Sequence, residues 1–96
     1  MKARNNKKRS IVEMSGFQAD GSEVVKLTLS VNDYYAGLHP ILDEAAFRRE
    51  KGIVRLVGVV YDKAGRVEER FENTYSSQGK YLHGRSEYAD GTVQTD

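Results

Sequence analysis

Cysteine and tryptophan are absent from the 96-residue chain, and proline occurs once. Without cysteine the chain can form neither a disulfide nor a thiolate metal site, which fits a reducing compartment, so we expect a cytoplasmic protein. No apolar run approaches the roughly 18–20 residues that cross a bilayer, and no apolar stretch of signal-peptide length follows the basic N-terminus. We therefore expect a soluble protein that makes no contact with a membrane.

Motifs for catalysis and for cofactor binding are also missing. The sequence contains no phosphate-binding GxxxxGK[ST] or GxGxxG, no zinc-binding HExxH, no EF-hand loop and no GxSxG nucleophile motif. The two histidines, His39 and His83, are too few for a zinc site when no cysteine is present. We therefore predict no metal and no cofactor, and we expect a binding protein rather than an enzyme.

Charge is distributed unevenly along the chain. The formal net charge is +1, but the first nine residues carry five basic side chains and no acid: Lys2, Arg4, Lys7, Lys8 and Arg9. Removing these five leaves ten Lys and Arg against fourteen Asp and Glu, so the rest of the chain has a formal charge of −4. We expect residues 1–9 to be a flexible basic arm and residues 10–96 a single domain. The arm either contacts nucleic-acid phosphates or is a solvated tail that aids solubility.

Alternating apolar residues predict a β-hairpin over residues 10–31. Asp20-Gly21 is a signal for a two-residue type I′ turn, in which Ala19 pairs with Ser22. This register places apolar side chains on one face of the hairpin. The expected cross-strand pairs are Gly16–Val25, Met14–Leu27 and Val12–Leu29.

A helix is expected over residues 40–51. Pro40 suits the first position of a helix, and Gly52 suits a left-handed helix stop. Acidic residues lie early in this stretch and basic residues late, which complements the helix dipole. Before it, Asn32 or Asp33 is expected to cap a short helical turn.

Residues 53–93 read as three strands joined by tight turns. The expected turns are a three-residue loop at Lys63-Ala64-Gly65, a four-residue loop over residues 76–79 and a type I′ turn at Asp90-Gly91, which would fold back a short sixth strand. Residues 61–67 resemble the YDxxGR pattern of the YD repeats in large bacterial toxin shells. The pattern occurs once here, whereas those proteins depend on many tandem copies, so the resemblance implies a hairpin turn and no function.

The predicted fold class is therefore α+β. An antiparallel sheet of five strands, or six with the short tail, follows the order ββαβββ, with one helix packed on it. In the predicted register Ile53, Val57 and Tyr61 share a face with Phe71 and Tyr75. The opposite face then has an apolar strip made of Val54, Leu56 and Val60. Either the N-terminal hairpin or a second copy of the chain would cover this strip, and we favour a homodimer.

The charged part of the same face contains the candidate site residues. In the predicted register Glu72 faces His83, and Arg70 faces Arg85. A carboxylate beside an imidazole suits acid–base chemistry, but it is also an ordinary cross-strand hydrogen bond. Tyr81 is expected beside His83, where it would stack on a base or a ligand.

The sequence favours a small binding or interaction module without catalytic activity. Its partner would be an unknown protein or small ligand, bound at the sheet face or in a pocket beside Tyr34 and Tyr35. The candidate binding residues are Tyr34, Tyr35, Arg70, Glu72, Tyr81, His83 and Arg85. One alternative is a nucleic-acid-binding accessory protein that uses the basic arm. Another is a small enzyme or ligand carrier in which Glu72 orients His83.

Overall fold

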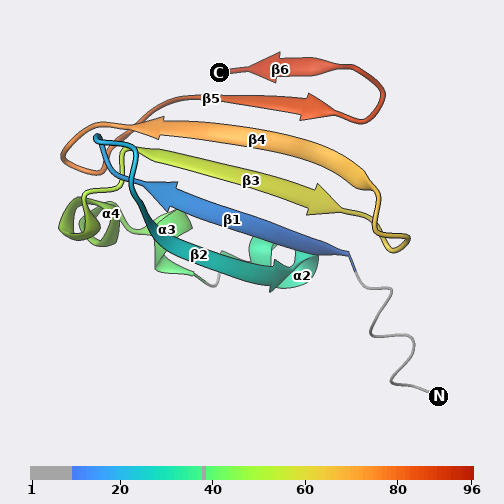
Figure 1. Ribbon diagram of the computed structural model, residues 1–96, viewed down its shortest axis with the longest axis horizontal. Coiled ribbons are helices and arrows are strands. Elements are labelled where there is room, and N and C mark those ends of the chain that lie inside the picture. Colours follow the sequence, from blue (N-terminus) through green and yellow to red (C-terminus); the bar gives the residue numbers. More distant parts are fainter. Residues whose placement is uncertain (1–9, 38) are drawn as a thin grey trace.

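The computed structural model describes residues 10–37 and 39–96, so the predicted arm over residues 1–9 lies outside it. Within these ranges the chain forms one six-stranded antiparallel sheet in the spatial order β2-β1-β3-β4-β5-β6, together with short helices (Figure 1). The α+β class and the order ββαβββ are confirmed. The elements are β1 (Ile11–Phe17), β2 (Glu23–Ser30), α2 (Val31–Tyr35), α3 (Pro40–Asp43), α4 (Ala45–Lys51), β3 (Arg55–Tyr61), β4 (Val67–Tyr75), β5 (Tyr81–Tyr88) and β6 (Val93–Thr95).

The helices cover only part of the sheet. They lie in the connection from β2 to β3. Helices α2 and α3 lie beside β1 and β2, and α4 lies at the end of the sheet next to the β4–β5 loop (Figure 1). Strand β1 pairs with β2 along one edge and with β3 along the other, so the connection carries the chain across β1 to its second edge. One face of the sheet therefore packs against helices, and the other has no helix from the described residues on it. None of the helices in residues 10–37 and 39–96 is long and apolar enough to cross a membrane.

All four hairpins close through the same kind of three-residue loop. The last loop residue is always a glycine with φ between 82° and 89°, and its N–H donates to the carbonyl of the residue before the loop at 2.9–3.0 Å. No non-glycine residue in the described part of the chain has a positive φ, so the predicted type I′ turns are wrong, as is the four-residue loop. The loops are Ala19-Asp20-Gly21, Lys63-Ala64-Gly65, Ser77-Gln78-Gly79 and Ala89-Asp90-Gly91.

The first hairpin has the predicted register: Val12 pairs with Leu29, Met14 with Leu27 and Gly16 with Val25. A bulge at Val24 reconciles this register with the longer loop, because Phe17 pairs with Glu23.

Two further bulges change the register of the C-terminal strands. Glu68 is an extra residue between the Tyr61–Val67 and Val60–Glu69 pairs, and Leu82 is extra between Tyr75–Tyr81 and Thr74–His83. A one-residue shift moves every later side chain to the other face. As a result Phe71 pairs with Gly58 rather than Val57.

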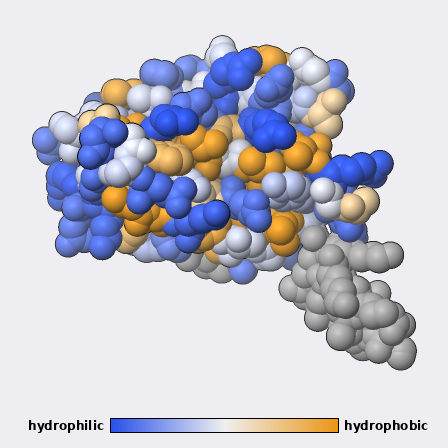
Figure 2. Space-filling view, in the orientation of Figure 1, coloured by the Kyte–Doolittle hydropathy of each residue, from blue (hydrophilic) through white to orange (hydrophobic). Residues whose placement is uncertain are grey.

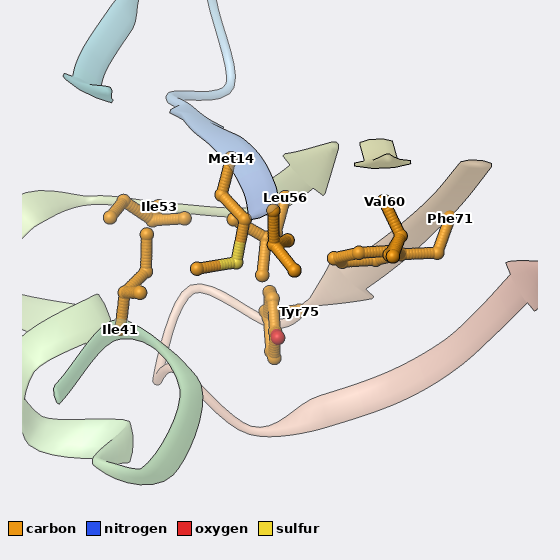
Figure 3. Packing of buried hydrophobic residues seen from close by; sticks show 8 residues of the cluster. Met14, Ile41, Ile53, Leu56, Val60, Phe71 and Tyr75 are labelled. Carbon is orange, nitrogen blue, oxygen red and sulfur yellow. The ribbon is translucent and has the colours of Figure 1, made fainter. Parts of the chain in front are cut away.

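The core lies between the sheet and the helices. Ile41 of α3 and Ile53 point toward each other beside Met14, while Phe71 lies against Val60 farther along the sheet (Figure 3). A Cβ at Gly58 would collide with the Phe71 ring, so the ring occupies the space that a side chain would need. The buried apolar residues are Val12, Met14, Ile41, Ile53, Leu56, Val60, Phe71 and Tyr75.

The prediction that Val54, Leu56 and Val60 lie on the face opposite Phe71 and Tyr75, and that a second copy of the chain covers them, is wrong. Leu56 is 0% exposed, Val60 is 2% exposed, and Val54 is half-buried. The Glu68 bulge is the reason, because it places Leu56 and Val60 on the same side as Phe71 and Tyr75. The core of the same chain covers this strip, so the strip cannot be a dimer interface.

The predicted helix over residues 40–51 is split into α3 and α4. Glu44 is extended, with φ −118° and ψ 109°, and separates the two. Pro40 begins α3, and Gly52 ends α4 in the left-handed region with φ 72°, both as predicted. The earlier helix α2 begins at Val31, and Ser30, rather than Asn32 or Asp33, caps it through its side chain.

Candidate interaction surface

The uncovered side of the sheet is the candidate site, and we call it the open face. Residues that pair directly across strands share a face, so the register fixes its members. None of these side chains is fully buried. The members of the open face are Ile11, Glu13, Ser15, Phe17, Glu23, Lys26, Thr28, Ser30, Arg55, Val57, Val59, Tyr61, Val67, Arg70, Glu72, Thr74, His83, Arg85, Glu87, Val93 and Thr95.

Apolar and aromatic side chains form the centre of the open face. Val57 and Val59 of β3 lie there half-buried, between Phe17 on β1 and Tyr61 at the end of β3. Figure 2 shows apolar side chains reaching the surface over the middle strands, surrounded by charged ones. The guanidinium carbon of Arg55 lies 4.9 Å from the centre of the Phe17 ring, so the apolar centre is bordered by a stacked cation.

Charges of alternating sign flank this centre on β4 and β5. Arg70 pairs with Glu87, and Glu72 pairs with Arg85, so the predicted Arg70–Arg85 pairing is wrong. The bases on the open face are Lys26, Arg55, Arg70 and Arg85, and the acids are Glu13, Glu23, Glu72 and Glu87. The face is therefore close to neutral, unlike a surface that binds phosphates through many cations.

The predicted Glu72–His83 pair does not form. The Leu82 bulge places Thr74 opposite His83, and Glu72 accepts a 2.6 Å hydrogen bond from Nε of Arg55 instead. Both members of this ion pair are about half exposed, so it contributes at most about 1 kcal/mol to stability. His83, Glu72 and Arg85 nevertheless line one shallow hollow of about 300 Å³ together with Thr74, Gly84, Thr95 and Asp96.

Tyr81 lies on the other side of the sheet from His83 and Arg85. It pairs with Tyr75, a core residue, and the two rings meet edge-on with centroids 6.0 Å apart. Its hydroxyl donates to Oδ2 of Asp96 at 2.7 Å, and this hydrogen bond raises the pKa of Tyr81 to about 12. Tyr81 lines a hollow of about 210 Å³ together with Asn73, Gly84, Arg85, Ser86, Gln94, Thr95 and Asp96. The pairing with Tyr75 places Tyr81 on the core side of the sheet, so Tyr81 is not part of the open face.

Tyr34 and Tyr35 have different environments. Tyr34 is half-buried and stacks on Phe71, with ring centroids 5.6 Å apart. Burial, and next the negative charge of Glu69, raises the pKa of Tyr34 to about 12. Tyr35 is 72% exposed, with its ring 5.0 Å from that of Tyr34. Tyr34 therefore holds α2 on the sheet, and only Tyr35 is presented to solvent.

His39 and Arg48 have structural positions. Nδ1 of His39 accepts a hydrogen bond from the N–H of Ile41 at 3.1 Å, which caps α3. Arg48 of α4 is 6% exposed and donates to the carbonyls of Ile41 and Gly79 at 2.9 Å. Neither side chain reaches the open face.

The apolar centre at Val57 and Val59 is the feature that sequence reasoning missed. Residues 53–61 have apolar side chains at both alternating sets of positions, so their pattern does not say which set faces the core. Gly58 was the available signal, because a glycine inside a strand often marks the close approach of another group. Placing the Phe71 ring on Gly58 gives the observed faces.

The residues that the structure describes contain no group of three or more histidine or acidic side chains that is arranged to hold a metal ion. Comparison of the chain with protein-family models, with curated proteins and with solved structures finds no match. The geometry of the open face is therefore the basis for a functional proposal.

Proposed function

We propose that the protein is a non-catalytic interaction module that binds a partner protein through the open face. The observation that carries this proposal is the uncovered apolar centre around Val57, Val59 and Phe17. Protein–protein interfaces combine an apolar centre, rich in aromatic residues and arginine, with a polar rim. Arg55, Arg70 and Glu72 supply such a rim on the β4 side of this centre.

Shape and charge favour a protein partner over the alternatives. The hollow at His83 is about 300 Å³, at the small end of the range for small-molecule sites, and it is lined mainly by polar residues. The balanced charges of the open face disfavour nucleic acid, which leaves the nucleic-acid alternative dependent on residues 1–9 alone. Glu72 is held by Arg55 rather than beside His83, which removes the orienting carboxylate from the enzyme alternative.

Site-specific photo-cross-linking in the cells that make the protein tests the proposal. A benzophenone amino acid replaces Val59 at the centre of the open face. In the control it replaces Glu50, an exposed residue of α4. We expect a discrete protein adduct from position 59 and none from position 50. No adduct from position 59, or the same adducts from both positions, would contradict the proposal.

A second comparison separates the open face from the basic arm. The position-59 probe is placed in the full chain and in a chain that begins at Ser10. We expect the same adduct from both. If the shorter chain folds but gives no adduct, residues 1–9 rather than the open face carry the binding.

A further inference from the structure

Strand β2 forms a long edge of the sheet with unpaired backbone groups. It spans eight residues, and its only strand neighbour among the described residues is β1. The N–H of Val31 donates to the carbonyl of Ser10, which fixes the phase of the β1–β2 ladder. In an antiparallel ladder the residues alternate, so Leu27 and Leu29 direct their backbone groups to β1, whereas Lys26 and Thr28 direct theirs outward. No hydrogen bond within the described ranges uses these outward groups.

The β2 edge lacks the usual protection against pairing with another strand. Such edges are normally short, or carry proline, several charges or inward-pointing charges. Strand β2 begins with a charged residue, Glu23, and a bulge at Val24, but from Val25 to Ser30 it has no proline and one charged side chain, that of Lys26. The opposite edge of the sheet is protected because its strand is short: β6 spans only three residues.

Apolar side chains on β2 are also incompletely covered. Val25, Leu27 and Leu29 point to the helix side, where they pack against the core but stay only partly buried. They lie at the boundary of the sheet, where a further strand would bury the rest of their surface. The backbone and the side chains of β2 therefore both lack one neighbour.

We propose that two copies of the chain pair through β2 in an antiparallel, two-fold arrangement that joins their sheets. In the register that fits best, Leu27 lies opposite Leu27 of the partner subunit and Lys26 lies opposite Thr28 of the partner subunit. The outward backbone groups of Lys26 and Thr28 then meet in hydrogen-bonded pairs, which the two-fold axis repeats.

Neighbouring registers are less favourable. Moving the partner strand by two residues in one direction places Lys26 opposite the partner's Lys26. Like charges directly opposite each other are destabilising. A shift in the other direction places Thr28 opposite the partner's Thr28 and shortens the paired segment. The sequence of β2 therefore favours one register.

The pairing goes beyond the proposed function, because the β2 edge and the open face are different surfaces. In the dimer the two open faces lie on the same side of the joined sheet, since antiparallel pairing keeps Lys26 and the partner's Thr28 on one face. A partner protein would then meet two apolar centres on one continuous surface.

Light scattering on the full chain over a range of concentrations tests the pairing. We expect a species of about twice 10.8 kDa that dissociates on dilution. Thr28→Pro removes an N–H that points away from β1, so the hairpin keeps its ladder while the edge loses a donor. We expect Thr28→Pro to be monomeric and Thr28→Ala to stay dimeric. A wild-type chain that is monomeric throughout would overturn the proposal.

A charge exchange tests the register without relying on proline. Thr28→Lys places two lysine pairs across the axis and should raise the dimer dissociation constant about tenfold. Within one chain the new lysine faces Glu13, so the fold should be preserved. Adding Lys26→Glu places opposite charges in both pairs and should restore the dimer. A dimer that Thr28→Lys does not weaken, or that the double variant does not restore, would overturn the proposed register.

Discussion

At the scale of single residues, Arg48 shows how a charged side chain stabilises this small core. Its guanidinium donates to the carbonyls of Ile41 and Gly79 and lies 4.2 Å from the centre of the Tyr75 ring. It therefore connects α3, α4 and the β4–β5 loop. A Cβ at Gly79 would collide with the Ala45 carbonyl, so the loop and α4 are in close contact at this point.

Replacing Arg48 should be costly because two buried carbonyls lose their donor. We expect Arg48→Met to lower the free energy of unfolding by about 2–4 kcal/mol, measured by urea denaturation. The matched control is Arg49→Met, at an exposed position of the same helix, which should change it by less than about 0.5 kcal/mol. Equal losses from the two variants would show that the Arg48 contacts contribute nothing specific.

Tyr34 gives the protein a pH dependence at alkaline pH. Because its pKa is raised from 10.0 to about 12, the folded state holds the proton more tightly than the unfolded state. This contribution to stability is fully present below pH 10 and is lost as the pH rises through about 12. We expect Tyr34→Phe to flatten the decline in the free energy of unfolding between these two values.

The matched control for Tyr34 is Tyr35→Phe, which removes a hydroxyl from the neighbouring exposed ring. Urea denaturation at several pH values from 10 to 12 compares both variants with the wild type. If the free energy of unfolding of Tyr34→Phe follows the wild-type curve throughout this range, burial of the Tyr34 hydroxyl is not the cause of the alkaline loss of stability.

At the scale of elements, the break at Glu44 leaves α4 with a weak start. Glu44 is the N-cap of α4, but its side chain makes no capping hydrogen bond. Serine at an N-cap accepts a hydrogen bond from the backbone of the first helical turn.

We expect Glu44→Ser to raise the free energy of unfolding by about 0.5–1 kcal/mol. Glu50→Ser within the same helix is the control, and it should cost a few tenths of a kcal/mol. A loss of stability from Glu44→Ser would contradict this account of the break.

Sequence patterns predicted the elements better than the faces. The pairs Met14–Leu27 and Val12–Leu29 follow from strict alternation, and the start at Pro40 and the stop at Gly52 follow from backbone chemistry. The bulges at Glu68 and Leu82 have no comparable signature, because any residue can occupy them.

The bulges explain why the structure brings together only some of the predicted site residues. Each one shifts a strand by one residue and so exchanges its two faces. Glu72, His83 and Arg85 still lie near one another because they remain on the same side of β4 and β5. Tyr81 moved to the other side because it precedes the Leu82 bulge.

At the scale of the whole molecule, the sheet is longer than its cover. The Cα extents are 46 × 29 × 23 Å, and the helices cover one face near β1 and β2 and the end of the sheet at the β4–β5 loop. A chain of this size buries a limited core, so its remaining apolar surface is more informative than in a large protein. The open face and the β2 edge are two separate parts of that surface, so the two proposals can fail independently.

Two neighbouring residues test the central claim, which is the assignment of the two faces. Val59 lies on the open face, whereas Val60 is 2% exposed and packs in the core. The measurement is the free energy of unfolding of Val59→Lys and Val60→Lys by urea denaturation. We predict a loss of at most about 1 kcal/mol for Val59→Lys and at least about 3 kcal/mol for Val60→Lys, because only the second buries an unpaired charge. Similar losses from both variants, or a greater loss from Val59→Lys, would contradict the assignment and with it the proposed open face.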